Sequence, residues 1–252
     1  MKTPVFLVAA VAVLMPLATQ AQTQTQSDTQ APDSSPFALQ DVRATVGVRM
    51  WRTSWLSWLG NGTEYWQAGG ENTAIPVVGV RYKDFLVSGS YLIEKGFTFT
   101  QGPASASVKR KEYDVNVGYF ILPGLAATLG YKEIRYGGEG YEWKAKGVTV
   151  GLSGSAPLAP STSLYGNIAY GRPELSDDFA FNKARGKYIL TELGLAFPLG
   201  HWNSSLNGFV VTAGYRYQRV GSYSNTGDPS LTQTSELYET TQGPVIGASY
   251  SF

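Results

Sequence analysis

The sequence ends with the stretch Gly243-Pro244-Val245-Ile246-Gly247-Ala248-Ser249-Tyr250-Ser251-Phe252. In an extended strand, successive side chains point to opposite faces. One face of this stretch is apolar and ends in aromatic residues, and it consists of Ile246, Ala248, Tyr250 and Phe252. The other face is mostly small or polar. The pattern therefore indicates a strand with one face against lipid and the other against a lumen of small side chains.

This stretch resembles the last strand of bacterial outer-membrane β-barrels, which carries alternating apolar residues and a terminal Phe. The resemblance covers the whole sequence and points to no particular subfamily. It implies an all-β fold, a transmembrane antiparallel up-and-down β-barrel in the bacterial cell outer membrane. It also implies that Ile246, Ala248, Tyr250 and Phe252 form a signal read by the barrel-assembly machinery. The expected partners are this machinery, outer-membrane lipid and lipopolysaccharide.

The composition agrees with this class. Among 252 residues there are 29 Gly, 16 Tyr, 11 Phe and 6 Trp, and 15% of residues are charged, against about 25% in ordinary soluble chains. Frequent Tyr is typical of the aromatic girdles at membrane interfaces. The net charge of +1 gives no reason to expect nucleic acid. The absence of Cys excludes disulfides, Cys-ligated zinc and thiol catalysis. No cofactor is expected.

Local composition divides the chain into three segments. Residues 1–21 read as a secretory signal peptide, with Lys2, the apolar run Val5–Leu17 and the cleavage site Thr19-Gln20-Ala21. Residues 22–37 are polar and predict a flexible linker. Residues 38–252 are assigned to the barrel. No later segment offers 18 consecutive apolar residues, so we expect no transmembrane helix.

Alternation with period two begins near Leu39. Val42, Ala44, Val46, Val48 and Met50 are expected to face outward, and the residues between them inward. Nine further stretches follow the same pattern, which predicts about ten strands, with eight or twelve as alternatives. Short turns alternate with long polar loops, predicted at Thr53–Asn72, Lys95–Lys109, Gly137–Glu142, Pro173–Gly186 and Gly221–Glu239. In this layout short turns are periplasmic, so both termini are predicted in the periplasm. A monomer is expected.

Seven charged residues fall on the predicted inward face. They are Arg43, Arg49, Arg81, Asp114, Lys132, Glu192 and Arg216. In a soluble barrel, whose core is apolar, burying them would be costly. In a small membrane barrel they predict a salt-bridged polar plug. The alternative interpretation is a narrow hydrated pore with a positive bias that favours anions.

Tryptophans cluster in the first predicted loop, Arg52–Gln67. Trp51, Trp55 and Trp58 are separated by four and three residues, a spacing typical of one face of a helical turn, and Trp66 follows. Because Trp prefers membrane interfaces, we expect an interfacial segment that anchors the barrel rim. The alternative is a binding site for lipid, sugar or a host surface.

The sequence argues against catalysis. Its single His, His201, lies in a predicted periplasmic turn, which leaves a His-dependent mechanism without a base at the other rim. Asp177-Asp178 and Glu174 predict a solvated loop face, with a divalent-cation contact as the alternative. No catalytic or metal-binding residue is predicted. The leading hypothesis is a non-enzymatic membrane protein whose extracellular loops contact lipid or a surface partner. The alternatives are a small, weakly anion-selective channel and, third, an outer-membrane enzyme.

Overall fold

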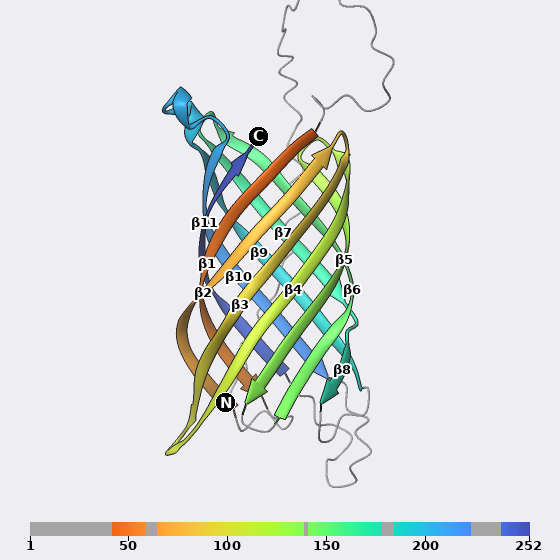
Figure 1. Cartoon of the computed structure of the whole chain (residues 1–252), viewed down its shortest axis with the longest axis vertical. Coiled ribbons are helices and arrows are strands. Elements are labelled where there is room, and N and C mark those ends of the chain that lie inside the picture. The colour runs from red at the N-terminus through yellow and green to blue at the C-terminus, as the bar shows by residue number, and fades with distance from the viewer. Residues whose placement is uncertain (1–41, 59–64, 139–140, 178–183, 223–237) are drawn as a thin grey trace, which may run out of the picture. The chain divides into compact units, whose positions relative to one another are not determined.

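The computed structural model describes residues 42–58, 65–138, 141–177, 184–222 and 238–252. The predicted signal peptide and linker lie outside these residues. Within them, no helix is long and apolar enough to cross a membrane. The described part of the chain is built almost entirely of β-strands (Figure 1).

Eleven strands and two short 3₁₀ helices follow one another in the described residues. The strands are β1 (Val42–Trp58), β2 (Tyr65–Tyr82), β3 (Phe85–Gln101), β4 (Ala104–Leu122), β5 (Leu125–Gly138), β6 (Tyr141–Ala159), β7 (Thr162–Gly171), β8 (Glu174–Asp177), β9 (Ala184–Pro198), β10 (Phe209–Ser222) and β11 (Tyr238–Ser251). The helices η2 (Leu199–His201) and η3 (Ser204–Leu206) join β9 to β10.

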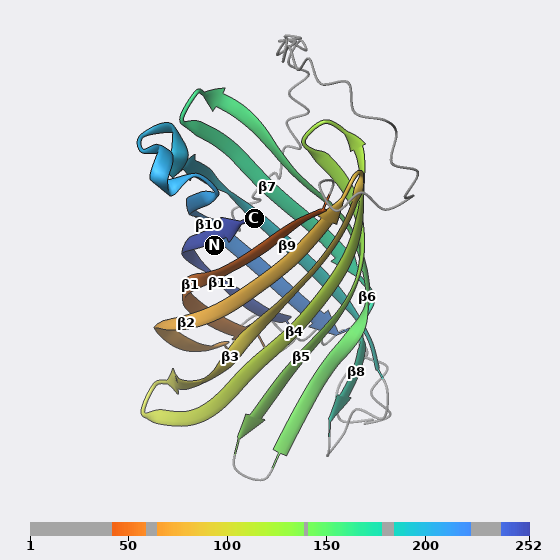
Figure 2. The same ribbon diagram turned by 45° about the horizontal axis from the view of Figure 1, so that its top comes forward.

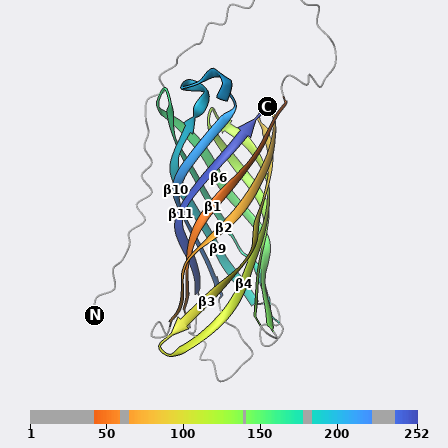
Figure 3. The same ribbon diagram turned by 60° about the vertical axis from the view of Figure 1, so that its left-hand side comes forward.

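The sheet closes on itself through its first and last strands. All pairings are antiparallel. They join neighbours in the chain except that β8 pairs with β6, β9 pairs with β7, and β11 pairs with β1 (Figure 3). At the seam the Ala44 amide donates to the Phe252 carbonyl over 2.9 Å, and the Phe252 amide donates back over 3.0 Å. The result is a closed antiparallel barrel of ten strands, which confirms the predicted fold and the favoured strand number.

The eleventh strand is the continuation of a broken one. Gly171 of β7 stands opposite Thr149 of β6, and Glu174 of β8 stands opposite Lys146 of the same strand, in one unbroken register. Pro173 lies between the two pieces. Proline has no N–H to donate to the ladder and is therefore found where pairing is interrupted. Strands β7 and β8 together occupy a single position in the wall.

Short turns join the strands at one end of the barrel. Lys83-Asp84 and Pro123-Gly124 are two-residue turns with positive φ at Lys83 (52°) and Gly124 (82°). Pro160-Ser161 and the η2–η3 segment make the other two connections at this end. The end of β11 lies there as well (Figure 1).

The predicted long loops are wrong in extent, because the strands continue far into them. The sharpest case is Lys95–Lys109, where β3 and β4 form a hairpin with the two-residue turn Gly102-Pro103. The hairpin projects at the end opposite the short turns (Figure 2). Phe97 and Phe99 alternate there with Gly96 and Thr98, a period-two pattern that the polar composition of the segment hid.

The outward face of the wall is apolar and the inward face is polar. Val78, Val115 and Leu129 point outward and are 59%, 55% and 56% exposed. Their inward neighbours are small or polar residues such as Gly79, Asn116 and Thr128. This polarity is the reverse of a soluble barrel and is the pattern expected of a wall in contact with lipid.

The hydrogen-bonded ladder between β2 and β3 is interrupted. Strands β2 and β3 pair up to Val77 and Ser90, and pair again only at Ala68 and Phe99. Pro76 lies in the interrupted stretch, where β3 also shifts register against β4. An ion pair of 3.1 Å between Lys95 Nζ and Glu71 Oε2 crosses the interruption.

Two neighbouring positions on β3 test which face of the barrel wall contacts lipid. Val87 points outward and is 50% exposed, whereas Ser88 points inward. We expect Val87→Lys to destabilise the barrel in a bilayer by about 2 kcal/mol, because a charge then faces hydrocarbon. Ser88→Lys should change the free energy of unfolding by less than about 1 kcal/mol. Urea unfolding in phospholipid vesicles measures both. Equal effects of the two substitutions would contradict the assignment of faces.

Candidate functional site

Glu112 on β4 lies at the centre of the barrel interior and is only 2% exposed. Its carboxylate accepts a hydrogen bond from Arg110 Nε over 2.8 Å and lies 2.8 Å from Lys132 Nζ. Gln218 Nε2 donates to it over 3.1 Å, and Arg216 Nη2 lies 4.0 Å away. Glu112 thus holds together side chains from three separate strands.

Two further carboxylates extend these contacts. Glu192 on β9 lies 3.1 Å from Arg49 Nη1 and 3.5 Å from Arg216 Nη1. Asp114 lies 3.2 Å from Lys132 Nζ. We call the connected set the interior charge network; its members are Arg49, Arg110, Glu112, Asp114, Lys132, Glu192 and Arg216. Because four cations meet three carboxylates, nearly every buried charge has an opposite partner, which burial requires.

The structure divides the seven predicted inward charges into two groups. Five of them belong to the interior charge network, whereas Arg43 and Arg81 stand opposite each other at the rim with the short turns. The Arg81 guanidinium lies 4.1 Å from the Phe120 ring centroid, and its Nε donates to the Lys83 carbonyl over 2.8 Å. These two arginines are exposed and make no contact with the network.

An aromatic cluster fills the interior on the other side of the network. Trp55 is its centre, with ring centroids 5.2 Å from Phe97, 4.7 Å from Phe99 and 4.9 Å from Tyr136. These rings pack with apolar side chains of β5, β6, β8, β9 and β10. The guanidinium of Arg110 lies 5.1 Å from the Trp55 ring, so a cation–π contact joins the cluster to the network.

Between the network and the cluster lie large side chains that are fully buried. Trp51 and Gln218 are both 0% exposed. The Arg216 guanidinium lies 4.9 Å from the Trp51 ring centroid, and Arg216 Nη2 donates to Gln218 Oε1 over 3.3 Å. These side chains form a packed layer between the network and the cluster.

The predicted interfacial tryptophan loop is wrong. Residues up to Trp58 belong to β1, and Trp66 belongs to β2, where it packs against the aromatic cluster. Trp51 and Trp55 point into the barrel. A spacing of four residues fits one turn of a helix, but four is also an even number, so it equally fits one face of a strand. The side chain of Trp58 lies outside the described residues.

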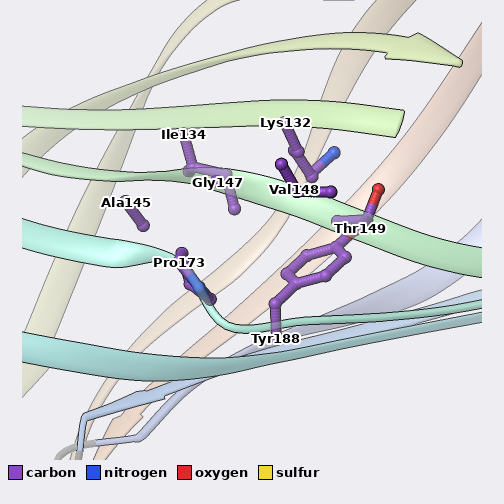
Figure 4. A pocket seen from close by; sticks show the side chains of 8 residues that line it. All are labelled: Lys132, Ile134, Ala145, Gly147, Val148, Thr149, Pro173 and Tyr188. Atoms are coloured by element: carbon purple, nitrogen blue, oxygen red, sulfur yellow. The ribbon is translucent and has the colours of Figure 1, made fainter. Parts of the chain in front are cut away.

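A small cavity lies beside the network, at the break between β7 and β8. Figure 4 shows Lys132, Gly147, Pro173 and Tyr188 around it. Lys132 Nζ lies 5.5 Å from the Tyr188 ring centroid. The cavity measures about 10 Å³, which is near the lower limit for one water molecule. It is therefore too small for a ligand.

No model of a protein family matches the sequence, and no curated protein matches it. Among solved structures, the outer membrane protease OmpT from Escherichia coli matches with a TM-score of 0.52 and 14% identity, over 87% of this chain and 99% of that chain. The translocator domain of the autotransporter NalP from Neisseria meningitidis matches with a TM-score of 0.42 and 11% identity, over 87% and 90%. Ail of Yersinia pestis matches with 0.30 and 17%, over 83% and 98%.

The chain has the fold of a bacterial outer-membrane β-barrel. At 14% identity the similarity to OmpT concerns the fold alone, and the same fold carries unrelated functions. What this barrel does must therefore be argued from its own side chains.

Among the residues that the structure describes, the groups considered for catalysis are not brought together. His201 lies in η2, in the connection between β9 and β10 at the end with the short turns, and it is exposed. Within the described residues, no three His, Asp or Glu side chains form a cluster that could hold a metal ion. Glu174 is an exposed residue of β8, whereas the side chains of Asp177 and Asp178 lie outside the described residues.

Sequence reasoning missed Arg110 and Glu112, the most central pair of the network. The predicted loop ended at Lys109 and the predicted strand began at Tyr113, so both residues fell between them. The sequence contained the signal for them, because Arg110, Glu112 and Asp114 continue the period-two alternation of the strand toward the end opposite the short turns. The two residues were missed because the predicted strand was ended at the point where its outward residues become polar.

Glu112→Gln tests the network. The substitution keeps the size of the side chain but leaves Arg110, Lys132 and Arg216 with one carboxylate fewer, and unpaired buried charges are costly. We expect the free energy of unfolding to fall by about 3–5 kcal/mol, measured by urea unfolding in vesicles with Trp fluorescence.

Glu142→Gln is the matched control for Glu112→Gln. Glu142 pairs with Lys144 over 2.9 Å on the outward face, where its side chain is 38% exposed. Exposed pairs contribute about 0–1 kcal/mol. If both substitutions cost less than about 1 kcal/mol, the network does not stabilise the barrel.

Proposed function

We propose that the protein is a non-enzymatic, integral barrel of the bacterial outer membrane, with a closed interior and an extracellular end that contacts lipid or a surface partner. The proposal is supported chiefly by the closed layer of the interior, in which Trp51 and Gln218 are fully buried. A barrel of ten strands has little lumen to begin with. Here the charge network and the aromatic cluster fill what there is.

The outward apolar band supports a place in a bilayer. Every backbone donor and acceptor in lipid needs an internal partner, and a closed barrel meets this requirement. The short turns correspond to the periplasmic turns of this fold class. The β3–β4 hairpin then lies on the outside of the cell, and the end of β11 lies in the periplasm.

Single-cysteine labelling tests location and orientation. The chain contains no Cys, so an introduced one is the only thiol. Ser105 is exposed near the tip of the β3–β4 hairpin, and Ser204 is exposed in η3 at the other end. We expect Ser105→Cys to react with a membrane-impermeant maleimide on intact cells. Ser204→Cys should react only after the outer membrane is permeabilised. The reverse pattern would contradict the orientation.

Conductance in a planar bilayer under a salt gradient tests the closed interior. We expect no discrete steps from the refolded protein, provided that a heat-modifiable gel band shows that it is folded. The double variant Trp51→Ala with Gln218→Ala removes two large side chains from the closed layer and should conduct. Steps from the unmodified protein with an anion-biased reversal potential would instead establish the channel. Arg49→Ala with Arg81→Ala should then alter the conductance.

A further inference from the structure

Three cations stand side by side on the outward face of β4, β5 and β6. Lys111 is directly opposite Arg135, and Arg135 is directly opposite Lys144. Like charges in directly opposite positions of neighbouring strands destabilise a sheet. We call these three residues the outward cation row. A local arrangement that opposes stability is characteristic of functional sites.

Carboxylates nearby neutralise the row only in part. Glu94 lies 3.5 Å from Lys111 Nζ and 3.6 Å from Lys109 Nζ. Glu133 pairs with Arg135, and Glu142 pairs with Lys144. Lys146 is the next outward residue of β6 beyond Lys144 and is exposed. Glu174 of β8 is exposed and stands directly opposite Lys146. On this face five cations therefore meet four carboxylates, which leaves a surplus of one positive charge.

The outer surface is hollowed at the row. A groove of about 510 Å³ is lined by Lys109, Lys111 and Arg135 together with Glu94 and Glu142. Ser107, Arg110, Tyr136, Gly137 and Gly138 complete its lining. On β5, Arg135 shares the outward face with Tyr131 and Leu129, so its guanidinium meets the groove from the outer face of the wall. Gly137 and Gly138 contribute no side chain to the lining.

The groove continues directly into the lipid-facing surface. Below Lys111 on the same face of β4 come Tyr113, Val115 and Val117, which are exposed. The Arg135 guanidinium lies 5.8 Å from the Tyr113 ring centroid, and Tyr113 stacks on Tyr91 at 4.9 Å. Tyrosines mark the membrane interface in this fold class. The row therefore lies at the height of lipid headgroups.

Outward cations at this end of the barrel continue onto β9, where Arg185 and Lys187 are exposed, but not onto β11. At the corresponding height above Ile246, β11 presents Pro244 and Gln242 outward, and neither carries a charge. The cation row spans three strands about 4.8 Å apart, and therefore roughly 10 Å. This width suits more than one phosphate group. Charge and location together point to an occupant with an anionic head and apolar tails.

We propose that the outward cation row, with Lys109 and Lys146, binds the phosphate headgroup of an anionic lipid in the outer leaflet. The lipid's acyl chains lie on the apolar band below Tyr113. The inference rests on the proposed function, because it requires that this end of the barrel face the outside of the cell. To the proposed contact with lipid it adds the residues of the binding site and the chemical class of the lipid.

The test measures how a phosphorylated lipid stabilises the folded protein. The full barrel is refolded in phosphatidylcholine vesicles, and bisphosphorylated lipid A is added at increasing mole fraction while the unfolding midpoint is followed. We expect the midpoint to rise. In the triple variant Lys111→Gln, Arg135→Gln, Lys144→Gln, the half-saturating mole fraction should increase at least about tenfold, since each cation near an anionic surface contributes about fivefold.

A matched variant controls for net charge. Arg43→Gln, Arg81→Gln and Lys83→Gln remove the same number of cations at the opposite rim, and this variant should keep the lipid-dependent rise. Lys144→Gln alone, which changes one partly exposed side chain, provides a second variant if the triple one does not fold. It should raise the half-saturating mole fraction about fivefold.

The other possible outcomes overturn either the binding site, the role of phosphate, the lipid or the proposed function. A lipid-dependent rise in the triple variant equal to that of the unmodified protein would overturn the site. An equal rise with dephosphorylated lipid A would overturn the role of phosphate, and an equal rise with inorganic phosphate would overturn the lipid as its source. Failure of the unmodified protein to insert into vesicles with a heat-modifiable band would instead count against the proposed function.

Discussion

The whole structure depends on the pairing of β11 with β1. In hydrocarbon no water is present to satisfy a free strand edge, so a sheet that faces lipid must close on itself. The reciprocal hydrogen bonds between Ala44 and Phe252 complete that closure. Closure in turn requires inward and outward faces of opposite polarity along every strand. The buried charges and the exposed valines are two consequences of the same constraint.

The packing of the interior follows from the small diameter of the barrel. Ten strands enclose a space that long side chains can fill, and Arg110, Glu112, Lys132 and Arg216 meet there at ion-pair distance. Charges so far from water are tolerated only when they are paired. The aromatic cluster around Trp55 packs against these charges through the contact of Arg110 with the Trp55 ring. The interior serves as a packed core with charges at its centre, and the binding surface proposed for this barrel lies on its outer wall.

Sequence reasoning succeeded where alternation was unambiguous. The outward valines and the last strand were predicted correctly because an apolar residue in every second position has one interpretation in lipid. It failed where the strands leave the membrane and both faces become polar or glycine-rich, as in the β3–β4 hairpin. It also failed at Trp51 and Trp55, whose spacing fits a helix and a strand equally. Above the membrane only pairing with a neighbour distinguishes a long strand from a loop.

The sequence by itself determined the class of fold and the face on which the residues of the apolar band lie, and it favoured ten strands, because alternation with period two is a local property of the chain. Only the tertiary structure decided which inward charges meet. Arg49 and Glu192 are 143 residues apart, and Gln218 and Glu112 are 106 apart. Their contact depends on closure and on the register of every intervening strand. The cation row on β4, β5 and β6 likewise exists only because the register places Lys111, Arg135 and Lys144 in line.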